Sequence, residues 1–153
     1  MNAEVILDAA AALFAERGVN AVGMGEVAAA AGCSRATLYR YFPDRHALHV
    51  AFVQREARRI GALLPTDPTG NVVEAILTAV REVRARPELI AWFGAADAGT
   101  TAELAQSEAV IGTFGDPDTA RWLVRVIVSL LIVPGRDAAD ERAMLERFVL
   151  PVL

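Results

Sequence analysis

The stretch GCSRATLYRYFPDRHAL, residues 32–48, decides how the sequence is interpreted. Its cations outnumber its single acid, Asp44, and they are Arg35, Arg40 and Arg45. Its aromatic residues crowd into four consecutive positions, as Tyr39, Tyr41 and Phe42. Guanidinium groups and phenols in such density are typical of a surface that meets a charged partner rather than of a core.

Punctuating residues in this stretch predict a tight turn between two short helices. Gly32 ends a helix that begins near Met24, and Ser34 is a natural N-cap for the next helix. Pro43 breaks the chain again, and Asp44 caps a longer fourth helix. The predicted helices around this turn cover about Met24–Ala31, Arg35–Tyr41 and Arg45–Leu63.

Two short helices joined by a turn with an early glycine resemble a helix-turn-helix, whose second helix enters the major groove of DNA by its N-terminal end. Arg35, Ala36 and Thr37 occupy that end here, where Arg can pair with guanine and Thr with a phosphate or a thymine methyl. Leu38 is expected to point inward. Phosphate contacts, which orient the protein, are predicted for Tyr39, Tyr41 and Arg45.

The residues from Ile6 to Phe52 closely resemble the DNA-binding region of TetR-type (tetracycline-repressor-type) transcriptional regulators. The matching strings are ILDAAAALFAERG, EVAAAAGCS and TLYRYFPDRHAL, with the family's spacing between them. The resemblance implies that Arg35, Ala36 and Thr37 read bases and that Tyr39, Tyr41 and Arg45 bind phosphates. It also implies that the remaining two thirds of the chain form a helical region for ligand binding and dimerisation.

The bulk composition is compatible with this interpretation. The net charge of the 153 residues is −4, but residues 1–60 hold seven Arg against six acids, whereas residues 61–153 hold eight Arg against thirteen. Local charge governs where phosphate binds, so only the N-terminal part suits DNA. The sequence shows no signal peptide and no apolar run long enough for a membrane, which predicts a cytoplasmic protein.

Helical periodicity continues along the rest of the chain, and no strand is expected, so the predicted fold class is all-α. On the fourth helix, Leu48, Phe52 and Ile60 form the apolar side, while Glu56 is expected on the opposite side with Arg58 and Arg59. PTDPTG, residues 65–70, is a linker. Further helices are predicted at about Val72–Arg86, Pro87–Phe93, Ala102–Thr113, Asp118–Val133 and Ala138–Leu150.

We therefore expect residues 1–45 to form a three-helix DNA-binding domain and residues 46–153 a helical effector-binding and dimerisation domain, linked by the helix from about 45 to 63. The passage IGTFGDPD, residues 111–118, is abrupt for the family. It is either a genuinely shortened helix or a place where residues are missing, and the sequence leaves both possibilities open.

Apolar residues in the C-terminal region suggest two further sites. A small apolar or amphipathic effector is predicted to bind between helices, in a pocket lined by Ile76, Val80, Trp92, Phe93, Ile111 and Phe114. The last two long helices are nearly apolar all round, which favours an intermolecular four-helix bundle. The predicted homodimer interface contains Trp122, Val126, Leu130, Val133, Leu145 and Phe148.

The predicted function is a ligand-responsive regulator, a repressor that binds a palindromic operator as a homodimer and is released when an effector shifts the fourth helix. The alternative is a helical protein-interaction module without DNA binding. No catalytic triad, phosphate loop or metal motif is present, so neither an enzyme nor a cofactor is expected. The i, i+3 pair His46 and His49 lacks further ligands, and Cys33 is interpreted as packing within the turn.

Overall fold

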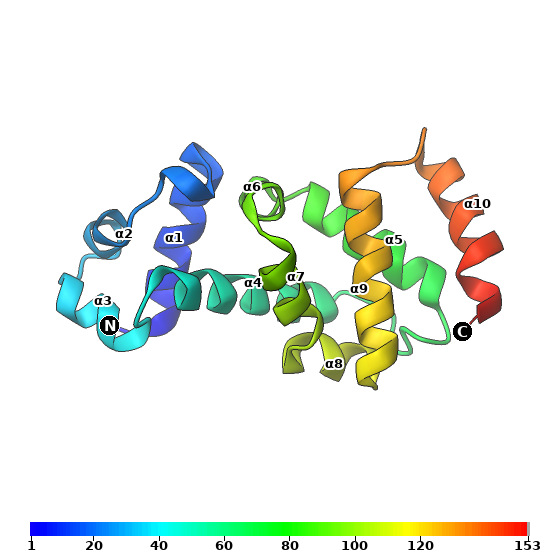
Figure 1. Ribbon diagram of the computed structural model, residues 1–153, viewed down its shortest axis with the longest axis horizontal. Coiled ribbons are helices and arrows are strands. Elements are labelled where there is room, and N and C mark those ends of the chain that lie inside the picture. Colours follow the sequence, from blue (N-terminus) through cyan, green and yellow to red (C-terminus); the bar gives the residue numbers. More distant parts are fainter. Residues whose placement is uncertain (153) are drawn as a thin grey trace. The chain divides into compact units, whose positions relative to one another are not determined.

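The computed structural model describes residues 1–152 and builds them from helices and connecting turns, without a strand in that range (Figure 1). This confirms the predicted all-α class. The helices are α1 (Ala3–Arg17), α2 (Met24–Ala30), α3 (Arg35–Tyr41), α4 (Arg45–Gly61), α5 (Val72–Arg84), α6 (Pro87–Ala95), α7 (Ala98–Ala105), α8 (Glu108–Phe114), α9 (Pro117–Ile132) and α10 (Ala138–Phe148), with 3₁₀ turns η1 (Val19–Ala21) and η2 (Leu150–Val152).

Internal contacts separate the chain into two compact units. The first unit combines Met1–Glu56 with Arg86–Leu104, and the second combines Ala57–Ala85 with the residues from Ala105 on. α6 belongs to the first unit because it packs against α1 and η1. The expected functional division into residues 1–45 and 46–153 is a different partition of the chain, and it stays a prediction.

The core of the first unit is built around aromatic rings from α1 and α4. Phe14 meets Phe52 edge to face at a centroid distance of 5.3 Å, and it meets His49 in the same way at 5.4 Å. Leu38 of α3 is fully buried, so it anchors that helix as expected. Edge-to-face pairs add roughly 0.5–1.5 kcal/mol each beyond the area that they bury.

Local backbone signals act as the sequence predicts. Gly32 adopts a φ of +70°, a conformation that favours glycine, and the amide of Cys33 donates to the carbonyl of Ala28. With the bond from Gly32 N–H to the Ala29 carbonyl, this closes α2 as a Schellman motif. Ser34 Oγ then accepts from the amide of Thr37 at 3.1 Å and starts α3.

The helix expected at about Ala102–Thr113 is wrong, because two helices, α7 and α8, occupy this stretch. Asp97 starts α7 early by accepting from the amide of Thr100 at 2.7 Å, and Ser107 takes the N-cap position of α8. In the passage 111–118, Gly115 turns the chain with a φ of +90°, and Asp116 caps α9. Two separate local caps therefore replace one continuous helix.

The placement of Glu56 on the solvent side of α4 was also wrong. Glu56 and the neighbouring Arg55 are each only 3% exposed. Glu56 lies four residues after Phe52 and four before Ile60, so it shares their buried face. Arg55 Nε donates to Glu56 Oε1 at 3.0 Å, and Arg55 Nη1 donates to Asp8 Oδ1 of α1 at 2.8 Å.

The second unit contains an ion pair whose carboxylate is buried and whose guanidinium reaches the surface. α5 packs against α9 and α10. Arg84 of α5 donates to Glu141 of α10 at 2.7 Å and to the carbonyl of Leu130 in α9 at 3.0 Å. Glu141 is 3% exposed and also accepts from the amide of Gly135, so one carboxylate fixes α5, α10 and the turn before it.

None of the described helices has the length and apolar character needed to cross a bilayer.

Replacing Arg55 by Met should lower the free energy of unfolding by roughly 3–5 kcal/mol, because it removes one partner of a buried ion pair. Urea denaturation followed by circular dichroism measures the change. Arg121→Met is the matched control, since Arg121 and its partner Asp118 are both exposed and the loss should stay below about 1 kcal/mol. Equal losses in the two variants would contradict a special role for Arg55.

Candidate nucleic-acid interface

The N-terminal end of α3 presents the three residues predicted to read bases. Arg35 and Ala36 are exposed, and Thr37 is half-buried. Ser34 and Thr37 share a hydroxyl–hydroxyl hydrogen bond of 2.9 Å, so the Thr37 hydroxyl is already oriented. Leu38, the next residue along the helix, is fully buried, so the backbone that carries Arg35, Ala36 and Thr37 is anchored to the core. The structure thus brings the predicted residues together on one accessible helix end.

The Arg35 side chain packs against α2 at a position where that helix has a glycine, Gly25. A Cβ added at Gly25 would lie 2.8 Å from Arg35 Nε and closer still to its Nη2, distances that real Cβ atoms do not show. Gly25 therefore leaves the space in which the guanidinium packs. The contact of Gly25 with Arg35 is not recognisable from the sequence, because a glycine inside a short helix gives no sign of which side chain crosses it.

The two tyrosines predicted to touch phosphate are placed differently. Tyr39 is 46% exposed on α3, so its hydroxyl is available to an outside partner. The Tyr41 hydroxyl instead donates to the backbone carbonyl of Met1 at 2.7 Å. Tyr41 thereby fastens the N-terminus to α3. Its predicted phosphate contact stays a prediction.

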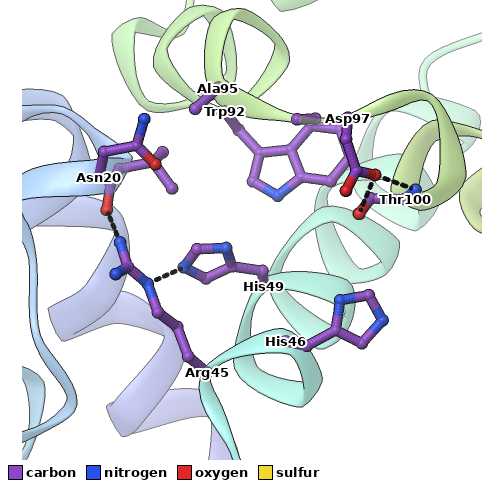
Figure 2. A pocket seen from close by; sticks show the side chains of 10 residues that line it. Asn20, Arg45, His46, His49, Trp92, Ala95, Asp97 and Thr100 are labelled. Atoms are coloured by element: carbon purple, nitrogen blue, oxygen red, sulfur yellow. Dashed lines mark hydrogen bonds between the residues drawn. The ribbon is translucent and has the colours of Figure 1, made fainter.

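Arg45, the third predicted phosphate contact, turns its guanidinium toward its own unit. Arg45 Nη2 donates to the carbonyl of Val19 at 2.7 Å, and Arg45 Nε donates to His49 Nε2 at 3.4 Å (Figure 2). These groups line a pocket of about 260 Å³ between η1, the start of α4, α6 and α7. Its other lining residues are Asn20, His46, Trp92, Ala95, Ala96, Asp97 and Thr100.

His49 is kept neutral in this pocket. Burial, followed by the positive charges of Arg45 and His46, lowers the pKa of His49 from 6.5 to about 4. A neutral imidazole that accepts at Nε2 carries its proton on Nδ1 and can still donate one hydrogen bond. The neighbouring His46 pairs instead with Glu103 of α7 at 2.8 Å.

The six residues predicted to bind an effector fall into both units. Trp92 and Phe93 belong to the first unit, where their rings meet edge to face at 5.0 Å. Ile76, Val80 and Phe114 are buried in the second unit, and Ile111 is half-buried there. Of the six, Trp92 lines the pocket of Figure 2, whose other walls are mainly polar. An apolar effector site stays a prediction.

The residues predicted for a dimer interface form an apolar face on α9 and α10. Trp122, Val133 and Phe148 are 44%, 70% and 60% exposed. Five of the six predicted residues line a groove of about 400 Å³, completed by Arg125, Ser129, Met144 and Val149. Val133 lies just beyond α9, while Leu130 and Leu145 are already buried within the chain and form the floor of the groove.

No cluster of three or more His, Cys, Asp and Glu residues that could hold a metal ion occurs within residues 1–152. The polar pocket itself escaped sequence analysis. The spacing of His46 and His49 is a visible signal, but the partners of both come from distant segments: Glu103 pairs with His46, and Phe14 meets His49 edge to face.

Comparison with known proteins gives these sites a context. The family model described as "Bacterial regulatory proteins, tetR family" matches residues 6–52. The uncharacterized HTH-type transcriptional regulator Rv1255c of Mycobacterium tuberculosis is 44% identical over an alignment that covers all of this chain and 86% of the relative. That alignment has 173 positions against 153 residues here, so 20 positions of the relative have no counterpart in this chain.

Two further comparisons extend over most of the chain. The HTH-type transcriptional repressor LfrR of Mycolicibacterium smegmatis is 30% identical, covering 89% of this chain and 78% of LfrR. A crystal structure of a TetR transcriptional regulator from Rhodococcus sp. RHA1 is 28% identical and superposes with a TM-score of 0.65, covering 94% of this chain and 90% of that one. Similarity thus continues beyond the first four helices.

The depressed pKa of His49 predicts acid sensitivity. Between about pH 6.5 and pH 4 the unfolded chain binds a proton at His49 that the folded chain does not, so stability falls as the pH falls through this window. His49→Gln should show a smaller fall in Tm between pH 7.5 and 4.5, measured by circular dichroism. His46→Gln is the control. If His49→Gln kept the pH dependence of the parent protein, proton uptake at His49 would not be its cause.

Proposed function

The chain belongs to the tetR family of helix-turn-helix transcriptional regulators, and from this membership we propose that it represses genes by binding a palindromic operator as a homodimer. The observation that carries the proposal is the exposed N-terminal end of α3, with Arg35, Ala36 and Thr37 side by side. LfrR, which aligns with most of this chain, is named a repressor, and this favours repression.

In the proposed complex α3 lies in the major groove. Arg35 pairs with a guanine, Ala36 allows the helix to approach closely, and Thr37 contacts a thymine methyl or a phosphate. Tyr39 binds a phosphate through its exposed hydroxyl. Phosphate contacts by Tyr41 and Arg45 require these side chains to exchange or share their present acceptors, the carbonyls of Met1 and Val19.

The proposed dimer pairs the α9–α10 face with the same face of a second chain. One helix-turn-helix reads one half-site, and half-sites lie about 34 Å apart, so the protein needs a fixed twofold partner. Trp122, Phe148 and Met144 are large apolar side chains that a lone chain leaves in water. Their burial in an isologous contact contributes roughly 1.5–3 kcal/mol per fully buried side chain.

A small apolar or amphipathic molecule is the proposed effector, bound near the predicted residues Ile76, Val80, Trp92, Phe93, Ile111 and Phe114. α4 supports a coupling mechanism because residues Arg45–Gly61 contribute to both compact units. An effector that binds one arrangement of α4 more tightly than another shifts the operator affinity by that difference.

Arg35→Ala should weaken binding to an operator selected from a random DNA pool by roughly 5- to 150-fold, the effect of losing about 1–3 kcal/mol of base contact. Fluorescence anisotropy at several salt concentrations measures the affinity. Arg81→Ala is the matched control, because Arg81 is also an exposed arginine but lies in the second unit. This change should leave the affinity nearly unchanged. A protein that selects no duplex, or equal losses in both variants, would favour a protein-interaction module instead.

Phe148→Asp should convert a homodimer into monomers, because it places a charge among the apolar side chains that line the groove on α9 and α10. Analytical ultracentrifugation gives the mass of each species. Ile90→Asp is the matched control, since Ile90 is also an exposed apolar residue but lies on α6. A monomeric parent protein, or dimers that persist in Phe148→Asp, would refute the proposed interface.

A further inference from the structure

The pocket in the first unit has polar walls contributed by four separate segments. Asn20 comes from η1, Arg45 and His49 come from the first turns of α4, Trp92 comes from α6, and Asp97 precedes α7. All of these residues belong to one compact unit. The pocket that they enclose has a volume of about 260 Å³, which suits a molecule of roughly ten to fifteen heavy atoms. A molecule bound there would touch η1, the start of α4 and α6 at once.

The indole of Trp92 gives the pocket a wall that belongs to the core. Trp92 is only 1% exposed as a whole residue, and it lines the pocket. Figure 2 shows the indole nitrogen on the ring edge that faces His49 and the open middle of the pocket. A ligand in the pocket would meet this N–H as a hydrogen-bond donor, and tryptophan N–H groups in largely buried surroundings usually bind such a partner.

The surrounding groups define what that partner would be. Arg45 brings a positive charge, and its Nη1 stays unused by the bonds to Val19 and His49. Neutral His49 offers a second donor beside the indole. Asp97 brings a carboxylate on the other side of the pocket, and both of its bonds to Thr100 use Oδ1 rather than Oδ2 (Figure 2). The pocket therefore offers hydrogen-bond donors from Arg45, His49 and Trp92 and an acceptor from Asp97.

We propose that this pocket binds a small hydroxy- or aminocarboxylic acid, whose carboxylate accepts from Arg45 and the Trp92 indole and whose hydroxyl or amino group donates to Asp97. Charge-assisted bonds from a guanidinium are the stronger ones, so Arg45 supplies most of the affinity. Such a ligand differs in chemistry from the apolar or amphipathic effector. The inference concerns ligand binding alone and does not rest on DNA recognition.

The chain carries a suitable reporter and an internal control, because it has two tryptophans, Trp92 and Trp122. Trp122 lies on α9, in the other compact unit. Their two indole signals are separable in a ¹H–¹⁵N correlation spectrum, and Trp122→Phe assigns them. The probe is 4-hydroxybenzoate, with 4-hydroxybenzamide as its uncharged counterpart.

Titration with 4-hydroxybenzoate should move the Trp92 indole signal saturably, with a Kd on the order of 1 mM for so small a molecule, and leave that of Trp122 in place. The benzamide should bind at least roughly tenfold more weakly, since it lacks the charge that Arg45 recognises. Arg45→Gln should abolish the preference for the acid over the amide.

Arg45 also holds the Val19 carbonyl, so a second variant tests the site without touching this bond. Ala95→Leu fills the pocket from α6 and should remove binding, whereas Ala102→Leu, exposed on α7 and outside the lining, should preserve it. The inference is overturned if the Trp92 signal of the folded parent protein does not respond to 4-hydroxybenzoate. It is equally overturned if acid and amide bind alike or if Ala95→Leu binds as the parent does. None of these outcomes depends on DNA, so each is distinguishable from a failure of the regulatory proposal.

Discussion

The buried guanidinium of Arg55 is the constraint on which the DNA-binding end of the protein depends. It joins Glu56 of its own helix to Glu4 and Asp8 of α1, and so it fixes the register between α1 and α4. A charge that is 3% exposed tolerates few alternative positions, because any displacement leaves it without compensation. An apolar contact at the same place would permit sliding. The polar network therefore specifies one arrangement of these helices.

From that fixed register the positions of α3 and of the pocket both follow. Phe52 and His49 lie on the same helix as Arg55, one and two turns before it, and both pack on Phe14. The start of α4 is thus determined, and Phe42 and Asp44 join it to α3 by a short connection. The helix end that carries Arg35 and the pocket wall that carries Arg45 are two products of one packing arrangement.

Sequence reasoning succeeded where structure is set by neighbouring residues. Gly32, Ser34 and Asp44 each act on a backbone group within five residues, so their effects are visible in a short string of letters. It failed where a polar side chain meets a partner forty or more positions away. The ion pair of Arg55 with Asp8 and the bond from Tyr41 to the Met1 carbonyl are such cases. No periodicity shows which distant carboxylate or carbonyl a guanidinium or phenol will find.

Trp92 shows the same limit at the proposed ligand pocket. A tryptophan among small residues predicts an apolar cavity, because sequence patterns treat tryptophan as an apolar residue. Its ring does serve as core, meeting Phe93 edge to face. The chemistry of the space beside it is set instead by Arg45, His49 and Asp97, which arrive from α4 and from the turn before α7. An indole has one polar group, its N–H. The direction in which this N–H points decides whether the residue only packs in the core or can also bind a ligand.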